Sequence, residues 1–193
     1  MTYWTLGSRE MVGVEFLHNL VREGVYRCLL RSRRRALHGK AAEWFRDRDF
    51  VLRAEHLEKA EDKGAAEAFY RAAEQSAFDY DYEQALALAD RGLALSRRGK
   101  VAFQLRYLKG ELLALLGRHA ASNEAYSDAL KGLRSRRPRC AVLVNMARNS
   151  SFLDKPRLAR PVLKQAEEIA LALGDPKLLS ASYRVRGALE HSL

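Results

Sequence analysis

The sequence lacks the features that mark membrane, secreted and disulfide-rich proteins. It has no run of about eighteen apolar residues, the minimum for a membrane-spanning helix. Near its start, Arg9 and Glu10 interrupt the apolar stretch that a signal peptide needs. The two cysteines, Cys28 and Cys140, lie far apart without metal-ligand spacing, so we expect two reduced thiols. These absences predict a soluble, cytoplasmic protein.

The motifs of common enzyme classes are also missing. No GxxxxGK[ST] motif is present to cradle phosphate groups, and no acidic pair follows a strand to hold magnesium. No two histidines form an HxxxH or HExxH pair, and nothing in the helical spacing brings Cys28 and His38 together as nucleophile and base. The sequence therefore predicts no catalytic residue, no metal site and no cofactor, and leaves room for a catalytic domain upstream. The histidines considered are His18, His38, His56, His119 and His191.

Glycine and proline are scarce, with twelve and four residues, while Ala, Leu, Glu and Arg dominate, which favours helix throughout. Hydrophobic residues make up 48% of the chain and charged residues 30%, a balance that provides a core and excludes a disordered chain. Basic residues outnumber acidic ones by 34 to 24, giving a net charge of +10. Such an excess attracts nucleic acid, anionic membranes or acidic partners, and the net charge alone does not distinguish these three classes.

The most informative feature that is present is a repeat with a fixed period. The segments YDYEQALALADRGLAL, GRHAASNEAYSDALKGL and DKPRLARPVLKQAEEIAL align on the small residues Ala85, Ser122 and Ala159. Both intervals are 37 residues (122 − 85 and 159 − 122). A constant period in this range is typical of stacked helical repeats, which hold partners more often than they catalyse reactions.

The repeat divides the chain into two regions. Residues 1–63 are predicted to form a small helical N-terminal region, with a short extended piece at 14–17, and Gly64 is the predicted break. Residues 64–193 are predicted to form three helix–turn–helix units and a half unit. The predicted helix pairs are 65–79 with 83–96, 101–116 with 119–133, and 139–152 with 156–173, and a last helix starts near 177. Pro161 predicts a local distortion or a late start of its helix.

Four positions of the unit carry small or interlocking residues at the same period. This pattern resembles the tetratricopeptide repeat, which has small residues where its two helices cross. The resemblance implies an all-α, right-handed solenoid. The copies are degenerate, because only Tyr126 keeps the family's aromatic and Lys109 stands where the family has Leu. The four sets are Ala73, Gly110 and Ala147; Ala85, Ser122 and Ala159; Ala89, Tyr126 and Leu163; and Gly92, Ala129 and Ala166.

The N-terminal region resembles the segment that follows the nucleotide-binding module of large bacterial signal-transduction ATPases, including those associated with nucleotide cyclases. The string EFLHNLVREGVYRCLLRSRRRALHGKAAEWF carries the likeness, and residues 54–60 continue it. In that family a winged-helix-like linker leads into a tetratricopeptide array. The resemblance implies a non-catalytic sensor arm of a signalling or transcriptional regulator, ending in an incomplete repeat. The matching residues are Phe16, His18, Leu20, Arg22, Tyr26, Leu29, Leu30, Arg33, Arg34, Arg35, Leu37, His38 and Ala41.

The first helices of such units line a concave groove, which is the predicted binding site for a protein or peptide segment. Aromatic residues would anchor the segment and charged residues would set its register. Asn145 and Arg148 suit an acidic tail, whereas the three glutamates of the groove oppose one. The predicted groove residues are Glu67, Tyr70, Glu74, Phe78, Gln104, Tyr107, Glu111, Val144, Arg148 and Phe152.

The sequence also suggests two other interactions, nucleic-acid binding and homodimerisation. The basic patch Arg31, Arg33, Arg34 and Arg35 and a second run at 134–139 favour either phosphate contacts on nucleic acid or ordinary solvated helix ends. The alternatives to the protein-binding module are a basic nucleic-acid-associated regulator and a non-catalytic fragment of an ATP-dependent signalling enzyme. The unpaired last helix also predicts homodimerisation through an exposed apolar face, which comprises Leu178, Leu179, Tyr183 and Leu189.

Overall fold

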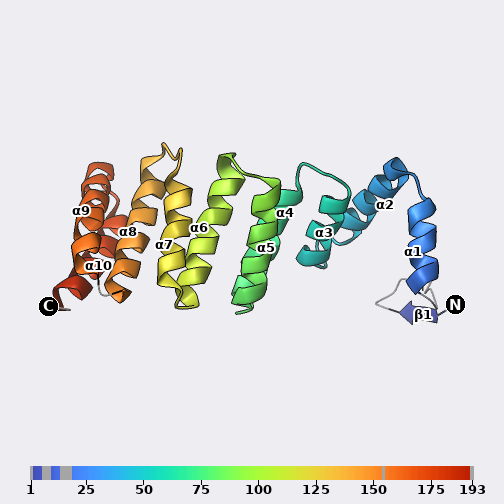
Figure 1. The fold of residues 1–193 in the computed structure, drawn as a ribbon, viewed down its shortest axis with the longest axis horizontal. Helices are drawn as coiled ribbons and strands as arrows, with labels where there is room; N and C mark the ends of the chain where they lie inside the picture. Colours follow the sequence, from blue (N-terminus) through green and yellow to red (C-terminus); the bar gives the residue numbers. More distant parts are fainter. Residues whose placement is uncertain (1, 6–9, 14–18, 154, 192–193) are drawn as a thin grey trace.

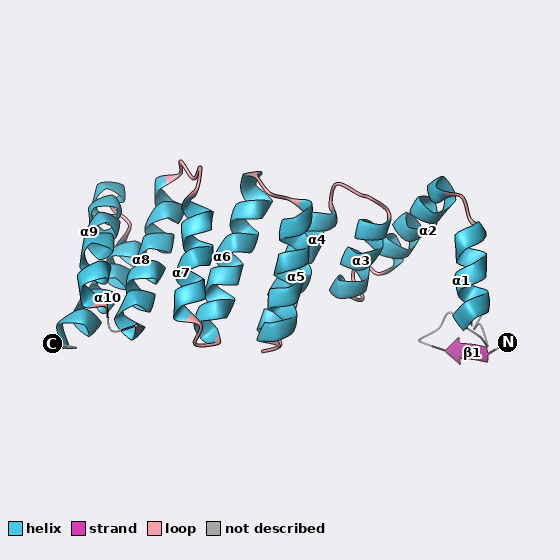
Figure 2. Cartoon of the chain, viewed as in Figure 1, coloured by secondary structure: helices cyan, strands magenta, loops and turns pink. Residues whose placement is uncertain are grey.

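The chain forms an elongated, all-helical repeat array preceded by a short hairpin (Figure 1). The computed structural model describes residues 2–5, 10–13, 19–153 and 155–191. Figure 2 shows that helices dominate the described residues, with the two chain ends at opposite ends of the molecule. The elements are β1 (Thr2–Thr5), β2 (Glu10–Gly13), α1 (Asn19–Cys28), α2 (Arg31–Trp44), α3 (Phe50–Lys59), α4 (Ala65–Phe78), α5 (Tyr82–Leu95), α6 (Gly99–Leu115), α7 (His119–Leu130), α8 (Arg136–Phe152), α9 (Pro156–Leu173) and α10 (Pro176–His191).

The strands β1 and β2 pair antiparallel, with Thr2 opposite Gly13 and Thr5 opposite Glu10. The sequence analysis did not predict this hairpin, although β1 consists of threonines and aromatic residues that favour strands. The extended piece predicted at 14–17 lies outside the described residues.

A histidine pair joins α2 to α3. The Nδ1 atoms of His38 and His56 are 2.9 Å apart, at hydrogen-bond distance, and the Tyr26 hydroxyl lies 2.9 Å from His38 Nε2. The Phe45 ring stacks on His56, with centroids 5.5 Å apart. Burial lowers the pKa of His38, and the charges of His56 and Lys59 lower it further. Burial and the Lys59 charge also lower the pKa of His56. The contact therefore favours neutral imidazoles.

The core crosses the boundary predicted at residue 63. Ala54 of α3 is fully buried in the same apolar cluster as Phe69 of α4 and Leu88 of α5. Arg91 of α5 strengthens this junction, because its guanidinium donates to Glu55 and Glu58 of α3 at 2.8 and 2.6 Å. Helix α3 thus packs on the first unit, and α2 packs on α3.

The helix–turn–helix pairs are α4–α5, α6–α7 and α8–α9, followed by α10, and the predicted all-helical repeat fold is confirmed. The late start predicted at Pro161 is wrong, because α9 begins at Pro156 and runs on to Leu173. Pro161 lacks the N–H group that would bond the carbonyl group of Arg157, and both residues are exposed.

All twelve repeat-register residues are buried. The middle unit shows why small residues are needed where the helices cross. A Cβ atom added to Gly110 would lie 2.6 and 2.7 Å from Tyr126 Cδ1 and Cζ, and closer still to Cε1. The aromatic ring on α7 thus occupies the space that a side chain on α6 would need. The first and third units have the smaller residues Ala89 and Leu163 in place of Tyr126. They have Ala73 and Ala147 in place of Gly110.

The last helix completes the core and does not present an apolar face. Val185 and Leu189 are 5% and 2% exposed and belong to the cluster formed by α8 and α9. Leu178 and Leu179 pack against the same cluster, and Tyr183 is the member of the predicted dimerisation face that is exposed, at 50%. The structure therefore removes most of the apolar surface on which the predicted homodimer depended.

Candidate protein-interaction surface

The first helices of the units lie side by side, since α4 contacts α6, α8 contacts α10, and Asn145 of α8 bonds Tyr107 of α6. Residues at equivalent positions on these helices recur every 37 residues and form rows across the array. One row comprises Tyr70, Tyr107 and Val144, the next Glu74, Glu111 and Arg148, and the last Phe78, Leu115 and Phe152. These rows make up most of the predicted groove.

The inner rows form a polar seam across α4, α6 and α8. Tyr70 donates to Glu74 on its own helix and bonds the side chain of Gln104 on α6. Further along, Asn145 Nδ2 donates to the Tyr107 hydroxyl at 3.1 Å, and Arg148 Nη2 donates to Asn145 Oδ1 at 3.0 Å. Glu111 and Arg148 are close enough to interact electrostatically. The structure thus brings together six predicted groove residues: Tyr70, Glu74, Gln104, Tyr107, Glu111 and Arg148.

Burial sets the protonation of this seam. It raises the pKa of Tyr107, with help from the Glu111 charge, to about 12, and it raises the pKa of Tyr70 to about 12. Both phenols therefore remain hydrogen-bond donors at neutral pH. Burial also raises the pKa of the Glu111 carboxyl, while the Tyr107 hydroxyl and the Arg148 charge act in the opposite direction.

The outer row is apolar and exposed. Phe78, Leu115 and Phe152 are the last residues of α4, α6 and α8, and they are 78%, 62% and 66% exposed. Leu115 is not among the predicted groove residues, although its counterparts Phe78 and Phe152 are. The 37-residue period alone identifies it, because it lies midway between the two phenylalanines.

A cavity of about 630 Å³ lies beside this row, between α6 and α8. Phe152 forms one wall, stacked on His119 with ring centroids 4.7 Å apart. Leu115 lines the same cavity together with the opposite charges of Glu111 and Arg148. The cavity therefore offers both an apolar contact and charged groups to a side chain that enters it.

Three predicted groove residues contribute less. Val144 is 6% exposed and packs in the core beneath α10, so it offers no accessible surface. Glu67 pairs with Arg71 on the same helix at 3.4 Å. Gln104 is half-buried and acts through its bond to Tyr70.

The basic patch of α2 is largely engaged within the chain. Arg31 Nε donates to Glu61 Oε1 at 2.8 Å, and Arg35 Nε donates to the carbonyl oxygen of Ala60 at 2.9 Å. The Arg34 guanidinium lies over the Tyr26 ring, 5.2 Å from its centroid. The hydrogen bond from Arg31 lowers the pKa of Glu61. The contacts of Arg31 and Arg35 hold α2 against the turn after α3, and that of Arg34 holds it against α1.

In the part of the chain that the structure describes, no group of three or more His, Cys, Asp or Glu side chains could hold a metal ion. Cys28 is exposed and Cys140 is buried, and both are free thiols. None of the described helices is long and apolar enough to cross a membrane.

Comparison with known proteins identifies the fold. No protein-family model and no curated protein matches the chain. Two solved structures of MamA, a TPR-like helical repeat protein, are similar to it. One is MamA 41-end from Desulfovibrio magneticus RS-1, with a TM-score of 0.50; the other is the MamA RS-1 ArsTM double mutant, with a TM-score of 0.51. Each is 14% identical, and each match covers 82% of this chain and 96% of the other. The fold is therefore a TPR-like all-helical solenoid.

Proposed function

We propose that this chain is a protein-interaction module that binds a segment of a partner protein along the first-helix face of α4, α6 and α8. The observation that carries the proposal is the exposed apolar row Phe78, Leu115 and Phe152 at one edge of the polar seam. The TPR-like fold supports it, because stacked helices present a continuous surface suited to a long segment.

The row and the seam have different roles in this proposal. Large apolar side chains that remain exposed at equivalent positions of three units provide a repeated anchor for apolar side chains of the partner. Glu74 and Glu111 belong to the first two units and Arg148 to the third, so the charge of the seam changes from negative to positive along the array. A partner with basic residues at one end and an acidic residue at the other matches this order and would bind in one direction.

We further propose that the module acts in the cytoplasm as the sensor arm of a signalling or transcriptional regulator. The support for this finer role is the resemblance of residues 15–45 and 54–60 to the linker segment of signal-transduction ATPases. The module itself would carry no catalytic group and would orient a partner domain. The test is whether a partner isolated with it contains a nucleotide-hydrolysing, cyclase, kinase or DNA-binding domain.

The binding surface can be tested without a known partner. Peptides selected from a random display library on the wild-type protein are synthesised, and their affinities are measured by isothermal titration calorimetry. Phe78→Asp, Leu115→Asp and Phe152→Asp are compared with Leu158→Asp and Leu171→Asp on α9, which are 60% and 61% exposed. We expect each row variant to weaken binding about 5- to 30-fold, the range for an interface anchor, and the α9 variants to bind as the wild type does.

All five substitutions are at exposed positions, so thermal melting should show folded proteins with stabilities near that of the wild type. Selected peptides that bind all variants equally, or that lose affinity in the α9 variants, would place the interaction elsewhere and contradict the proposal.

The nucleic-acid alternative stays a prediction of the sequence. It requires binding that weakens steeply with salt and disappears when Arg33, Arg34 and Arg35 are replaced. The contacts of Arg34 and Arg35 within the chain favour the structural role of these side chains.

A further inference from the structure

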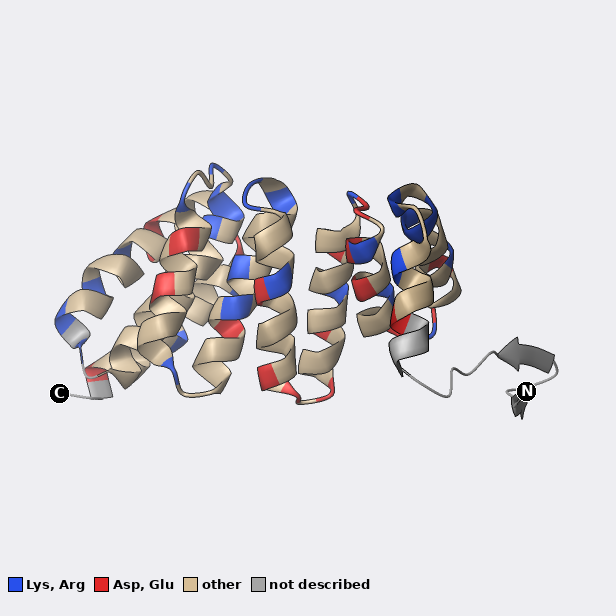
Figure 3. Cartoon of the chain, turned by 45° about the vertical axis from the view of Figure 1, so that its right-hand side comes forward, with Lys and Arg blue, Asp and Glu red and all other residues tan. Residues whose placement is uncertain are grey.

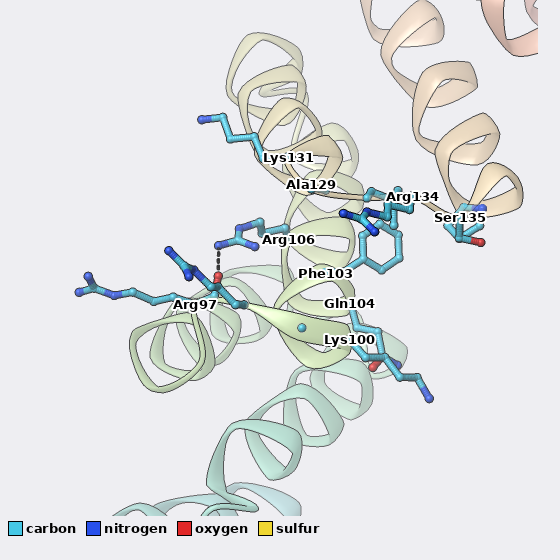
Figure 4. Close-up of a pocket in the computed structure, with 14 residues that line it drawn as sticks. Arg97, Lys100, Phe103, Gln104, Arg106, Ala129, Lys131, Arg134 and Ser135 are labelled. Atoms are coloured by element: carbon cyan, nitrogen blue, oxygen red, sulfur yellow. Dashed lines mark hydrogen bonds between the residues drawn. The ribbon is translucent and has the colours of Figure 1, made fainter.

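A second cavity lies at the opposite edge of the array from the apolar row. It opens between the α5–α6 loop and the α7–α8 loop, at the N-terminal ends of α6 and α8, and its volume is about 740 Å³ (Figure 4). Gly99 and Gly132 turn the two loops with φ values of +87° and +76°, which side-chain-bearing residues rarely adopt. The size is that of a site for one small molecule.

The lining of this cavity carries charge of one sign. It contains six cationic side chains and no acidic one: Arg97, Arg98, Lys100, Arg106, Lys131 and Arg134. Figure 4 labels five of these cations, which come from both loops and from α6: Arg97, Lys100, Arg106, Lys131 and Arg134. Figure 3 shows basic loops in blue at the upper edge of the molecule.

Few of these charges are neutralised by the chain. Lys131 forms an ion pair with Asp128 at 2.7 Å, and Arg106 Nη2 donates to the backbone carbonyl of Arg97 at 2.8 Å. The other four side chains form no ion pair with any described residue. Because like charges repel one another, gathering them around one opening is unfavourable unless an anion binds there.

The floor of the cavity is apolar. It is lined by Phe103 of α6, Ala129 of α7, Leu133 of the α7–α8 loop and Pro138 of α8. Phe103 is half-buried and is oriented by the Tyr107 ring, with centroids 6.0 Å apart. An aromatic side chain in the same cavity as several cations suits a ligand that combines a flat apolar body with several negative charges.

We propose that this cavity binds a nucleoside di- or triphosphate. Four of the six cations are arginines, whose planar forks match phosphate oxygens two at a time. A di- or triphosphate concentrates its charges within one small molecule, as the cavity concentrates its cations, whereas a peptide distributes one carboxylate per side chain along its length. The base would lie on Phe103. The site lies at the other edge of the array from the apolar row Phe78, Leu115 and Phe152, and it shares Gln104 with the polar seam.

The test uses the full chain and three probes: ATP, tripolyphosphate and a hexaglutamate peptide, each titrated calorimetrically without divalent cations. We expect saturable ATP binding, about fivefold tighter than that of tripolyphosphate because the base adds a stacking contact. Replacing Arg97 and Arg134 together by Ser should weaken ATP binding by at least about tenfold, since two charge-assisted contacts are lost. The matched control, Arg157→Ser with Arg160→Ser on α9, removes the same charge elsewhere and should leave the affinity within about twofold.

A second variant separates the base from the phosphates. Phe103→Leu should reduce ATP affinity to that of tripolyphosphate and leave tripolyphosphate binding unchanged; if it fails to fold, the comparison of the two probes on the wild type decides the point. The proposal is overturned by the absence of saturable ATP binding, by equal losses in the cavity and control variants, or by a hexaglutamate peptide or a single-stranded oligonucleotide that binds more tightly than ATP.

Discussion

Replacing Gly110 by Ala tests the packing argument for the repeat. The added Cβ atom would lie 2.6 Å from Tyr126 Cδ1 and 2.7 Å from Cζ, where carbon atoms normally approach to about 3.5–4.0 Å. Tyr126 is completely buried, and the Tyr107 ring lies against it with centroids 5.8 Å apart. The ring therefore cannot swing away, and α6 and α7 must separate instead.

Two effects of opposite sign determine the size of the change. Overpacking a core costs about 1–3 kcal/mol, while exchanging Gly for Ala inside a helix contributes up to about 1 kcal/mol. Gly187 provides the matched control, because it lies within α10 and an added Cβ atom meets nothing within 4 Å. We expect Gly110→Ala to lower the free energy of unfolding by about 1–2 kcal/mol and Gly187→Ala to raise it by about 0.5–1 kcal/mol. For a chain of this length, each kcal/mol shifts the melting temperature by about 2–4 °C.

Urea denaturation followed by circular dichroism measures both variants, and a double mutant identifies the cause. The third unit carries Ala147 and Leu163 at the two positions, so Tyr126→Leu should provide room for Gly110→Ala. The two changes should couple by about 0.5–3 kcal/mol in favour of the double mutant. If Gly110→Ala is as stable as the Gly187 control, or the two substitutions are additive, the contact between ring and glycine does not determine the residues at these positions.

Other contacts make predictions that the same assays can check. Arg91→Ala should lower the free energy of unfolding by about 1–2 kcal/mol and accelerate hydrogen exchange first in α3, because the guanidinium bonds two glutamates of α3 and covers the Phe69 ring at 4.5 Å. Unchanged hydrogen exchange in α3 would contradict this prediction. Asn149→Ala should lower the urea midpoint by the equivalent of about 1–3 kcal/mol, since the buried amide donates to partners on α7 at 2.7 and 3.1 Å. The pKa values of His38 and His56 are lowered below 6.5, so their contribution to stability is present above that pH and is lost as the pH falls through the folded values. Melting between pH 7.5 and 5 should therefore show a larger loss of stability in the wild type than in a His38→Gln variant, and parallel curves would refute the assignment.

The repeat period explains how much of the fold could be predicted. Helices that stack need small residues where they cross, and this need recurs once per unit. The positions aligned with Ala85 consequently identified the buried crossings in every unit. The hairpin of β1 and β2 gave no comparable signal, because two four-residue strands are too short to show an alternating pattern.

The site was predicted less completely, because exposure depends on neighbours that the repeat pattern does not describe. Val144 occupies the same row as Tyr70 and Tyr107, yet α10 packs over the third unit and buries it. Likewise, the second cavity gathers cations from positions 97–106 and 131–134, which the sequence separates by a whole helix. The antiparallel packing of α6 against α7 brings the start of α6 next to the loop that follows α7.

The direction of the helices explains why the array has two chemically different edges. Every first helix runs the same way, so the N-terminal ends of α6 and α8 meet at the cationic cavity, and the C-terminal ends of α4, α6 and α8 present Phe78, Leu115 and Phe152. The polar seam with Tyr107 lies between these edges. A small anion at one edge leaves the apolar row at the other uncovered, so both could be occupied together. A selected peptide should therefore keep its affinity for the Arg97→Ser, Arg134→Ser protein, and ATP should keep its affinity for Phe152→Asp, which makes the two proposals independent of each other.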